Sequence, residues 1–303
     1  MLGKKKKARP AARPAGSTRR DDGEPARWAG AALGIAVTLG VVALLGAALY
    51  AVRGGLLSSP AYSRRVARVR LPGISEQLPP DIARGVVAFV QQAAEGRSVF
   101  EDGLTRAVHE RALANPWIAS VNGVSKQPDG EVLVEAQYRR PFALVRSAAL
   151  PAGPLVVVDA QGAVLPIAPS RVRRGECLTI GDVASPPPAA GSKWDAPDLI
   201  DGLKLLKLLR PRPYFDQISL IDVRNHDGSS QLEPHIRFWA QVGRRRRTDV
   251  RFGRFPLDDL DDCVSPATRL EWLDAIVARY GGRLAGIRNF IELRYDEPYE
   301  SDG

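Results

Sequence analysis

The feature that most constrains this chain is an uncharged apolar segment near its N-terminus. Residues 29–52 contain no Asp, Glu, Lys or Arg. As an α-helix, a segment of this length spans roughly 36 Å, and the hydrocarbon core of a bilayer is about 30 Å thick. The run is longer than the apolar core of a cleaved signal peptide, and core helices of soluble proteins seldom lack a polar face over such a length. We therefore predict a single transmembrane helix over 29–52.

The residues at the ends of this segment suit a membrane interface. Trp28 precedes it and Tyr50 lies near its far end. Amphipathic aromatic rings favour the headgroup region on both sides of a bilayer. We therefore expect these two side chains to anchor the helix, which would hold the rest of the chain on the far side of the membrane.

The tail over residues 1–28 decides the orientation. It contains nine Lys or Arg against three Asp or Glu, and arginines also flank the far end of the apolar segment. The arginines on the two sides of the apolar segment balance each other. The four consecutive lysines of the tail therefore decide the charge asymmetry, and they favour a cytoplasmic N-terminus. A tail so poor in large apolar residues is expected to be disordered. We expect it to contact anionic lipid through Lys4, Lys5, Lys6 and Lys7 rather than to bind DNA.

The part of the chain beyond the apolar segment has the composition of an ordinary folded protein. Over the whole chain, 45% of the residues are hydrophobic and 25% are charged, as in globular domains generally. The tail supplies most of the net charge of +9. The large domain is therefore not a strongly basic nucleic-acid-binding protein, and we expect no nucleic-acid partner.

Residues 62–140 follow the pattern of a small α+β module. A short apolar strand over 66–71 precedes a helix in which Ile82, Val86 and Val90 recur at helical spacing. A second helix over 101–114 and two strands over 118–125 and 131–138 follow, and the turn sequence Gln-Pro-Asp-Gly joins the two strands. We predict two helices on one face of a three-stranded sheet.

Residues 141–298 predict a second, larger sheet with flanking helices. Strand-like segments occur at four places, and a leucine-rich helix lies between the first and the second of them. We expect this helix to direct Leu203, Leu206 and Leu209 toward a core. The fold class is thus α+β, with a mixed or antiparallel β domain over 141–298 and a short tail over 299–303. The strand-like segments are 155–158, 218–223, 236–242 and 290–295, and the helix is 199–209.

No familiar catalytic, cofactor or metal motif is present. The sequence has no phosphate-binding glycine loop, no nucleophile elbow and no Cys-x-x-Cys pair. Its three histidines, His109, His226 and His235, have no zinc-ligand spacing. The acidic cluster of Asp258, Asp259, Asp261 and Asp262 could bind a cation, but a solvated loop or a helix N-terminus explains it as well. We expect no enzyme, cofactor, metal or small-molecule substrate.

Two further features leave alternatives open. The run Arg244–Arg247 is either a solvated hairpin tip between two strands or a contact site for an acidic partner or anionic lipid. The two cysteines, Cys177 and Cys263, are either separate buried thiols or a disulfide, which would require their Cα atoms to lie within roughly 7 Å.

Residues 115–118 read Asn-Pro-Trp-Ile, residues 138–143 read Tyr-Arg-Arg-Pro-Phe-Ala and residues 290–296 read Phe-Ile-Glu-Leu-Arg-Tyr-Asp. These phrases resemble the bacterial cell-division family FtsQ/DivIB, whose first extracytoplasmic module is a POTRA domain. Asn115 to Ile118 resembles the family's Pro-Trp step from the second helix into the second strand. The stretch from Val124 to Ala143 resembles its hairpin signature, although Tyr138 and Arg139 stand where Glu-Arg is usual.

The resemblance continues to the C-terminal end. Val156 to Gly162 resembles the family's Asp-x-x-Gly hairpin, and Val250 to Arg254 resembles a strand that ends in Leu-Gly-Arg. Phe290 to Asp296 is similar to the family's Asp-Leu-Arg-Tyr phrase. The likeness therefore covers about residues 62–298, in the family's order.

This resemblance implies a bitopic scaffold of the inner membrane that recruits other bitopic division proteins to the septum and helps to regulate wall synthesis. Recruitment would use β-augmentation, in which an edge strand pairs with a strand of the partner. The positions carried over to that edge are Phe290, Glu292, Arg294 and Tyr295.

The POTRA module would present a second recruitment surface. The positions carried over to it are Arg70, Gly73 and Trp117, although Trp117 would equally suit the core. The family usually continues past its C-terminal phrase, whereas this chain stops at Gly303, and Glu297-Pro298 is expected to limit how far the last strand extends.

Two other interpretations remain open. POTRA modules also serve as docking modules in envelope assembly and secretion, where they accompany a long β-barrel for which residues 141–298 are too short and too helical. A membrane-anchored enzyme with an unrecognised site is the third alternative.

Overall fold

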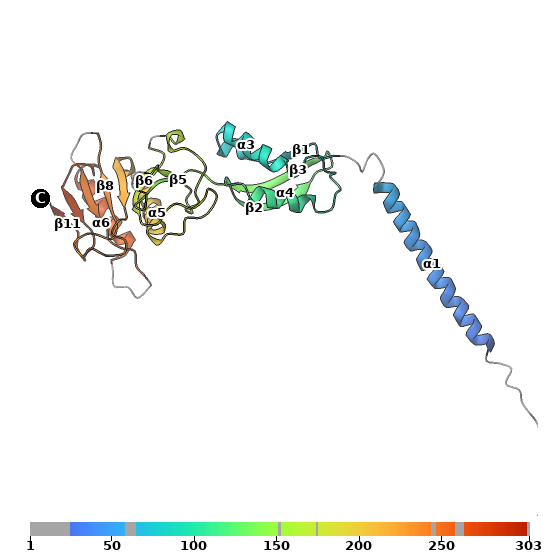
Figure 1. The fold of residues 1–303 in the computed structure, drawn as a ribbon. Coiled ribbons are helices and arrows are strands. Elements are labelled where there is room, and N and C mark those ends of the chain that lie inside the picture. The colour runs from blue at the N-terminus through green and yellow to red at the C-terminus, as the bar shows by residue number, and fades with distance from the viewer. Residues whose placement is uncertain are drawn as a thin grey trace, which may run out of the picture. The chain divides into compact units, whose positions relative to one another are not determined.

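The computed structural model describes residues 25–57, 65–150, 153–173, 175–243, 247–257 and 264–301. The chain divides into two compact units, Met1–Ser63 and Arg64–Gly303. Within the first unit the described element is one helix, α1 (Pro25–Leu57), drawn in blue in Figure 1. The four lysines predicted to touch lipid lie outside the described residues.

Helix α1 confirms the predicted long apolar helix. Its segment Leu33–Gly55 is long and apolar enough to cross a membrane, and none of it is buried within the protein. A fully exposed apolar surface of this size is unfavourable in water, which is consistent with a membrane anchor. Tyr50 is exposed on this helix, while the side chain of Trp28 lies outside the described part of the chain.

The first part of the second unit, which we call the first module, is a three-stranded sheet covered by helices. Its strand order is β1-β3-β2, with β1 parallel and β2 antiparallel to β3. The predicted order of strand, helix, helix, strand, strand is confirmed, with one short additional helix after the first strand. The elements are β1 (Arg68–Arg70), α2 (Ile74–Gln77), α3 (Pro80–Gln91), α4 (Leu104–Leu113), β2 (Ile118–Lys126) and β3 (Glu131–Tyr138).

Local sequence explains these elements. Pro80 occupies the first turn of α3, where its missing N–H costs nothing. The face of α4 formed by Leu104, Val108 and Ala112 is fully buried, as the helical spacing predicts. Gly130 adopts a φ of 94° in the β2–β3 turn, a conformation that favours glycine.

The second part is an eight-stranded mixed sheet in the order β11-β10-β9-β8-β7-β6-β4-β5. Together with the first part it confirms the α+β class. The elements are β4 (Ala143–Ser147), β5 (Val156–Val158), η1 (Pro169–Arg171), β6 (Leu178–Val183), α5 (Pro197–Leu209), η2 (Phe215–Gln217), β7 (Ile218–Asp222), β8 (Arg237–Ala240), β9 (Thr248–Arg251), α6 (Pro266–Arg279), β10 (Phe290–Glu292) and β11 (Tyr299–Ser301).

One hydrophobic core joins this sheet to its helices. Leu203, Leu206 and Leu209 of α5 are buried, as predicted, and belong to the same cluster as Phe238 of β8 and Val250 of β9. Because side chains alternate between the two faces of a strand, the neighbours of these buried residues point to the opposite face. Over β8 and β9 this opposite face, which we call the open face, carries Arg237, Trp239, Asp249 and Arg251.

The two sheets share part of their packing. Val157 of β5 and the nearby Leu165 belong to the hydrophobic cluster of the three-stranded part. Arg171 of η1 pairs with Asp81 of α3 at 2.5 Å. These contacts explain why residues 64–303 form one compact unit.

The structure differs from the sequence predictions at two kinds of place. Strands β4 and β6 were not predicted. Residues 299–301, expected to belong to a tail, form β11 and pair with β10. The acidic cluster, Cys263 and Arg244 to Arg246 lie outside the described residues.

Candidate functional site

The C-terminal end of the large sheet is built from three short strands. β10 is parallel to β9 and antiparallel to β11, and β11 is the last strand in the sheet order. The prediction that β10 forms the edge is therefore wrong, because the chain turns back after β10 and adds one more strand. Pro298 lies in that connection rather than within a strand, where its missing N–H would remove a ladder hydrogen bond.

Side-chain contacts hold β11 in place. The carboxylate of Glu300 accepts hydrogen bonds from Arg279 at 2.9 Å and from the Tyr280 hydroxyl at 3.0 Å, both belonging to the end of α6. Arg288 adds a third contact to it at 3.3 Å. On the other face, the rings of Phe290 and Tyr299 lie 6.0 Å apart. Within the described residues, no strand pairs with the outer side of β11.

The four residues predicted for the edge have different environments. Glu292 is buried and forms a bidentate pair with Arg294, with both contacts at 2.7 Å. Phe290 is half-buried beneath the guanidinium of Arg251, 4.1 Å from its ring centre. Tyr295 is 61% exposed and lies in the turn after β10. Tyr295 is therefore the one of the four with a large free surface.

The predicted recruitment surface of the first module is only partly present. Arg70 is exposed at the end of β1, and Gly73 adopts a φ of 70° just before α2. Trp117 is only 6% exposed and packs in the core of the module, which is the second of its two expected environments. The Tyr138 hydroxyl donates to the carbonyl of Pro72 at 3.1 Å, so this corner is tied to β3.

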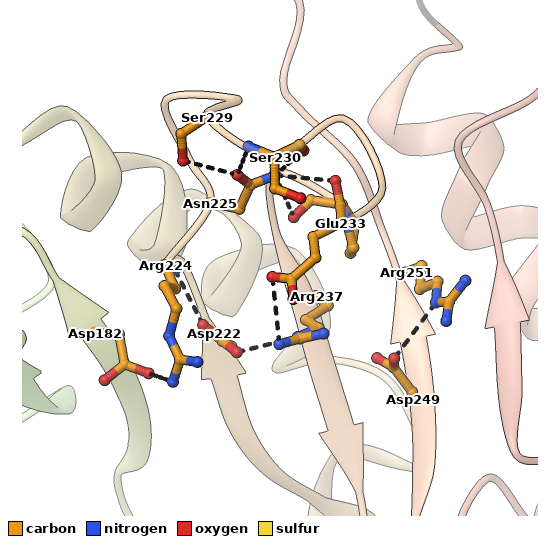
Figure 2. Close-up of polar contacts among 11 residues, drawn as sticks. Asp182, Asp222, Arg224, Asn225, Ser229, Ser230, Glu233, Arg237, Asp249 and Arg251 are labelled. Atoms are coloured by element: carbon orange, nitrogen blue, oxygen red, sulfur yellow. Dashed lines mark hydrogen bonds and ion pairs between the residues drawn. The ribbon is translucent and has the colours of Figure 1, made fainter.

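The open face of the large sheet carries a ladder of ion pairs, which Figure 2 shows across neighbouring strands. On β7 and β8, Asp222 accepts from Arg237 at 3.0 Å. Beside them, Arg224 donates to Asp182 at 2.7 Å. Burial acts to raise the pKa of the Asp182 carboxyl, but Arg224 and Arg146 together outweigh it, so the pKa is lowered.

Asp249 of β9 differs from the other acids of this face. It is 7% exposed, and its Oδ2 lies 3.4 Å from the Nε of Arg251 (Figure 2). Its Oδ1 has no hydrogen-bond partner among the described residues. Burial raises the pKa of this carboxyl despite the nearby arginines. A buried acceptor left without a donor is uncommon in folded proteins and calls for an explanation.

Sequence reasoning missed this face. Its residues occupy every second position of β8 and β9, with Arg237 and Trp239 on one strand and Asp249 and Arg251 on the next. Alternation of polar or aromatic residues with buried ones is the signal that would have identified it.

The groups that could support catalysis are dispersed. His226 pairs with Asp201 at 2.9 Å, whereas burial lowers the pKa of His235 and nearby arginines reinforce that shift. Cys177 is a buried free thiol whose pKa burial raises to about 11. In the described ranges, no cluster of three or more His, Cys, Asp or Glu side chains could hold a metal ion.

A cavity lies where the two sheets meet. It has a volume of about 690 Å³ and is lined in part by Arg139, Asp159 and Arg210. Arg139 donates to Asp159 at 2.7 Å, and both side chains are largely buried. This ion pair joins the end of β3 to the turn after β5, so it has a structural role.

No family model matches the sequence, and no curated protein matches it.

Proposed function

We propose that this chain is a non-enzymatic, single-pass scaffold of the bacterial cell-division machinery, which recruits other bitopic division proteins and helps to regulate septal wall synthesis. The observation that carries the proposal is the open edge of β11 at the C-terminal end of the large sheet. An edge strand offers a row of main-chain donors and acceptors to which an extended segment of a partner can pair.

Three further features support this proposal. α1 is long and apolar enough to be a membrane anchor. The order of strands and helices in the first module agrees with the POTRA pattern that the resemblance implies. The phrases similar to the FtsQ/DivIB family lie in strands or turns of both sheets, in the family's order.

The position of β11 refines the proposed mechanism. A partner strand would pair with the outer side of β11, and Tyr295 and Tyr299, which are 61% and 60% exposed, would flank it. Aromatic side chains with exposed rings are frequent anchors of protein interfaces. Glu292 and Arg294 would act indirectly, because their bidentate pair holds the turn that carries Tyr295. Arg70 and Gly73 remain the proposed positions for recruitment by the first module.

The proposal is tested first by the location of a fluorescent protein fused to the N-terminus in dividing cells. We expect a band at the division plane as constriction begins. A uniform distribution around the envelope throughout the cycle would reject a division role. It would favour a docking module of another envelope pathway.

The docking edge is tested by comparing Tyr295→Asp with a chain that ends after Pro298, which lacks β11. We expect both variants to lose the bitopic division proteins that co-purify with the wild type after cross-linking. Leu113→Asp is the matched control, because Leu113 is an exposed apolar residue on α4, in the first module. Equal recovery of these partners by all variants, with the fold intact, would reject β11 as the docking edge.

A further inference from the structure

The cavity between the two sheets is built on a connection that both modules hold in place. The chain passes from β3 to β4 here, and main-chain bonds fix both ends of the connection. The N–H of Arg139 donates to the carbonyl of Trp117 at 2.8 Å, and that of Phe142 donates to the carbonyl of Val158 at 2.9 Å. The buried carboxylate of Asp159 accepts from Arg139 at 2.7 Å. The cavity is therefore preformed, and its volume of about 690 Å³ falls within the range of small-ligand sites, roughly 300–1,000 Å³.

Two arginines at the rim of this cavity are available to an anionic ligand. Arg140 and Arg210 line the cavity and are exposed, and within the described residues neither guanidinium forms an ion pair. The guanidinium of Arg210 lies 4.9 Å from the ring centre of Phe142, and this contact restricts its orientation. A guanidinium binds a carboxylate through two parallel hydrogen bonds. The rim therefore offers two positions for carboxylates.

The rim also carries one acid and two side-chain amides. Glu176 is exposed and forms no ion pair in the part of the chain that the structure describes. Burial is the main cause that raises the pKa of the Cys177 thiol, and Glu176 adds to the rise while Arg210 opposes it, so both charges lie near this thiol. Gln137 and Gln161 are exposed at the same rim, and each amide can both donate and accept. These groups complement a ligand that has two carboxylates, one cationic group and amide groups.

We propose that this cavity binds a short acidic peptide with a free amino terminus. The carboxylates of the peptide bind Arg140 and Arg210, and its ammonium group binds Glu176. Its peptide groups pair with the side-chain amides of Gln137 and Gln161. The residues that line the cavity belong to neither β10 nor β11, so the inference does not depend on the docking edge of the proposed function.

The charges of the rim favour a peptide over other anionic ligands of similar size. A sugar acid brings a carboxylate to the two arginines but has no ammonium group for Glu176, whose charge would repel it. A nucleotide brings several negative charges on neighbouring phosphates, and it too lacks a cationic group for this acid. A peptide with a free amino terminus carries both signs of charge and amide groups together.

The test is calorimetric titration of the full chain in detergent micelles with the tripeptide Ala-Ala-Glu, near pH 6.5, where the amino terminus is charged. This peptide has one ammonium group and two carboxylates. Arg140→Gln and Arg210→Gln should each weaken its binding about tenfold, because a charge-assisted contact is lost.

Lys207→Gln is the matched control. Lys207 is an exposed residue of α5, less than one turn before Arg210, and it lies outside the cavity lining that the structure describes. We expect this variant to bind Ala-Ala-Glu within about twofold of the wild type, as for a surface charge without contact to the ligand. Equal weakening by Lys207→Gln and Arg210→Gln would overturn the proposal, because only the net charge would then matter.

Acetylation of the peptide tests the contact with Glu176. Acetyl-Ala-Ala-Glu should bind the wild type about fivefold more weakly than the free peptide, because the exposed pair between the ammonium group and Glu176 is lost. In Glu176→Gln, the same acetylation should change the affinity by less than about twofold. A fivefold effect of acetylation in both proteins would overturn the proposal, because the ammonium group would then bind elsewhere.

A second ligand separates the peptide from other anions. A disaccharide that contains glucuronate should bind the wild type roughly tenfold more weakly than Ala-Ala-Glu, since it lacks the ammonium group and the peptide groups. Binding as tight as that of the peptide would overturn the proposal of a peptide ligand and identify a site for an anionic sugar. Absence of binding of both ligands at millimolar concentration would overturn the site itself. Neither result bears on β11, which is tested by the recovery of partners.

Discussion

The two ends of the eight-stranded sheet are finished in different ways. At one end, β5 is covered along its outer side, where Leu165 donates to Val157 at 2.8 Å and Asp159 donates to Ala163 at 3.0 Å. A second segment lies beyond, with Gly191 donating to Val164 at 2.8 Å. At the other end, β11 is a three-residue strand whose outer side meets no other strand in the described part of the chain.

This difference indicates that the β5 end of the sheet stays covered, whereas the outer main-chain groups of β11 are available to pair with another strand. The β5 end is held by main-chain pairing, by shared apolar packing with the first module and by a buried ion pair. The β11 end is held by contacts of Glu300 and by one aromatic pair. Local opening has the lowest cost where few buried contacts must break, so β11 should open more readily than β5.

The largest expected effect is at the closed end, with Asp159→Ala. The Asp159 side chain accepts hydrogen bonds from Arg139 at 2.7 Å and from the main-chain N–H groups of Gln161 and Ala163 at 2.9 and 2.8 Å. Removal of the Asp159 carboxylate leaves the largely buried guanidinium of Arg139 without this acidic partner. We expect the free energy of unfolding to fall by about 3–5 kcal/mol. Urea denaturation of the full chain in micelles, followed by tryptophan fluorescence, measures this change.

Asp195→Ala is the control for that prediction. Asp195 is an exposed acid that pairs with Lys193 at 2.9 Å, and surface pairs of this kind contribute at most about 1 kcal/mol. If Asp159→Ala destabilises the chain no more than Asp195→Ala, the β5 end is not the fixed end and the comparison fails.

The packing of the first module against the large sheet is tested by Gly191→Ala. Gly191 has a φ of 88°, and an added Cβ would lie 3.3 Å from the ring of Pro116, ahead of β2. A positive φ costs an L-residue about 1–2 kcal/mol, and the close contact should add about 1 kcal/mol. Gly175→Ala is matched, with a φ of 83° and open space around its Cβ. A larger loss in unfolding free energy at Gly191 would confirm that the modules are packed together, and equal losses would contradict it.

The sequence predicts the first module better than the large sheet, and particular residues explain why. Helices α3 and α4 present apolar residues at helical spacing, and the β2–β3 turn has the strong Pro-Asp-Gly signal, so local information is sufficient. β6 contains Gly181-Asp182, which reads as a turn. In the fold, Gly181 leaves room for Arg146, whose guanidinium would be 3.0 Å from an added Cβ. The need for a glycine at position 181 comes from a side chain on the neighbouring strand β4, so the sequence around Gly181 does not reveal it.

The candidate site shows the same limitation. β11 has the residues Tyr-Glu-Ser, which carry no strand periodicity, and its stability depends on contacts of Glu300 with α6 and Arg288. β-propensity depends on such tertiary context. The C-terminal phrase lies on β10, one strand in from the edge, and the identity of the edge strand required the fold. The pairing of Arg247 with Trp239 likewise required the strand register.

The open end is tested by Glu300→Gln. The substitution keeps the shape of the side chain and removes the charge that Arg279 and Arg288 contact at 2.9 and 3.3 Å. Both arginines are partly exposed, so we expect a loss of about 1 kcal/mol in unfolding free energy. Amide hydrogen exchange should accelerate several-fold in β10 and β11 and stay unchanged in β5. Faster exchange at both ends would mean that the sheet opens as one unit, which would contradict the proposed difference between its edges.

The smallest expected effect is a pH dependence that distinguishes the middle of the sheet from its open edge. His226, which follows β7, contacts Asp201 of α5 at 2.9 Å, and this hydrogen bond raises the pKa of the imidazole although burial opposes it. Because the folded pKa lies above the unfolded value of about 6.5, the pair stabilises the fold fully below pH 6.5. This contribution is lost as the pH rises through the folded pKa. We expect the wild type to lose up to about 1 kcal/mol more than His226→Gln between pH 6 and pH 8 in urea denaturation. The comparison is made in a His235→Gln background, because the charge of His226 also acts on the pKa of His235. His109 is common to both proteins.

The open edge at β11 should not share this pH dependence. Glu300 is contacted by the Tyr280 hydroxyl and by two arginines, which stay charged in this range. The difference in exchange between wild type and Glu300→Gln at β11 should therefore be the same at both pH values. A pH dependence of that difference would show that the open edge is coupled to the centre of the sheet.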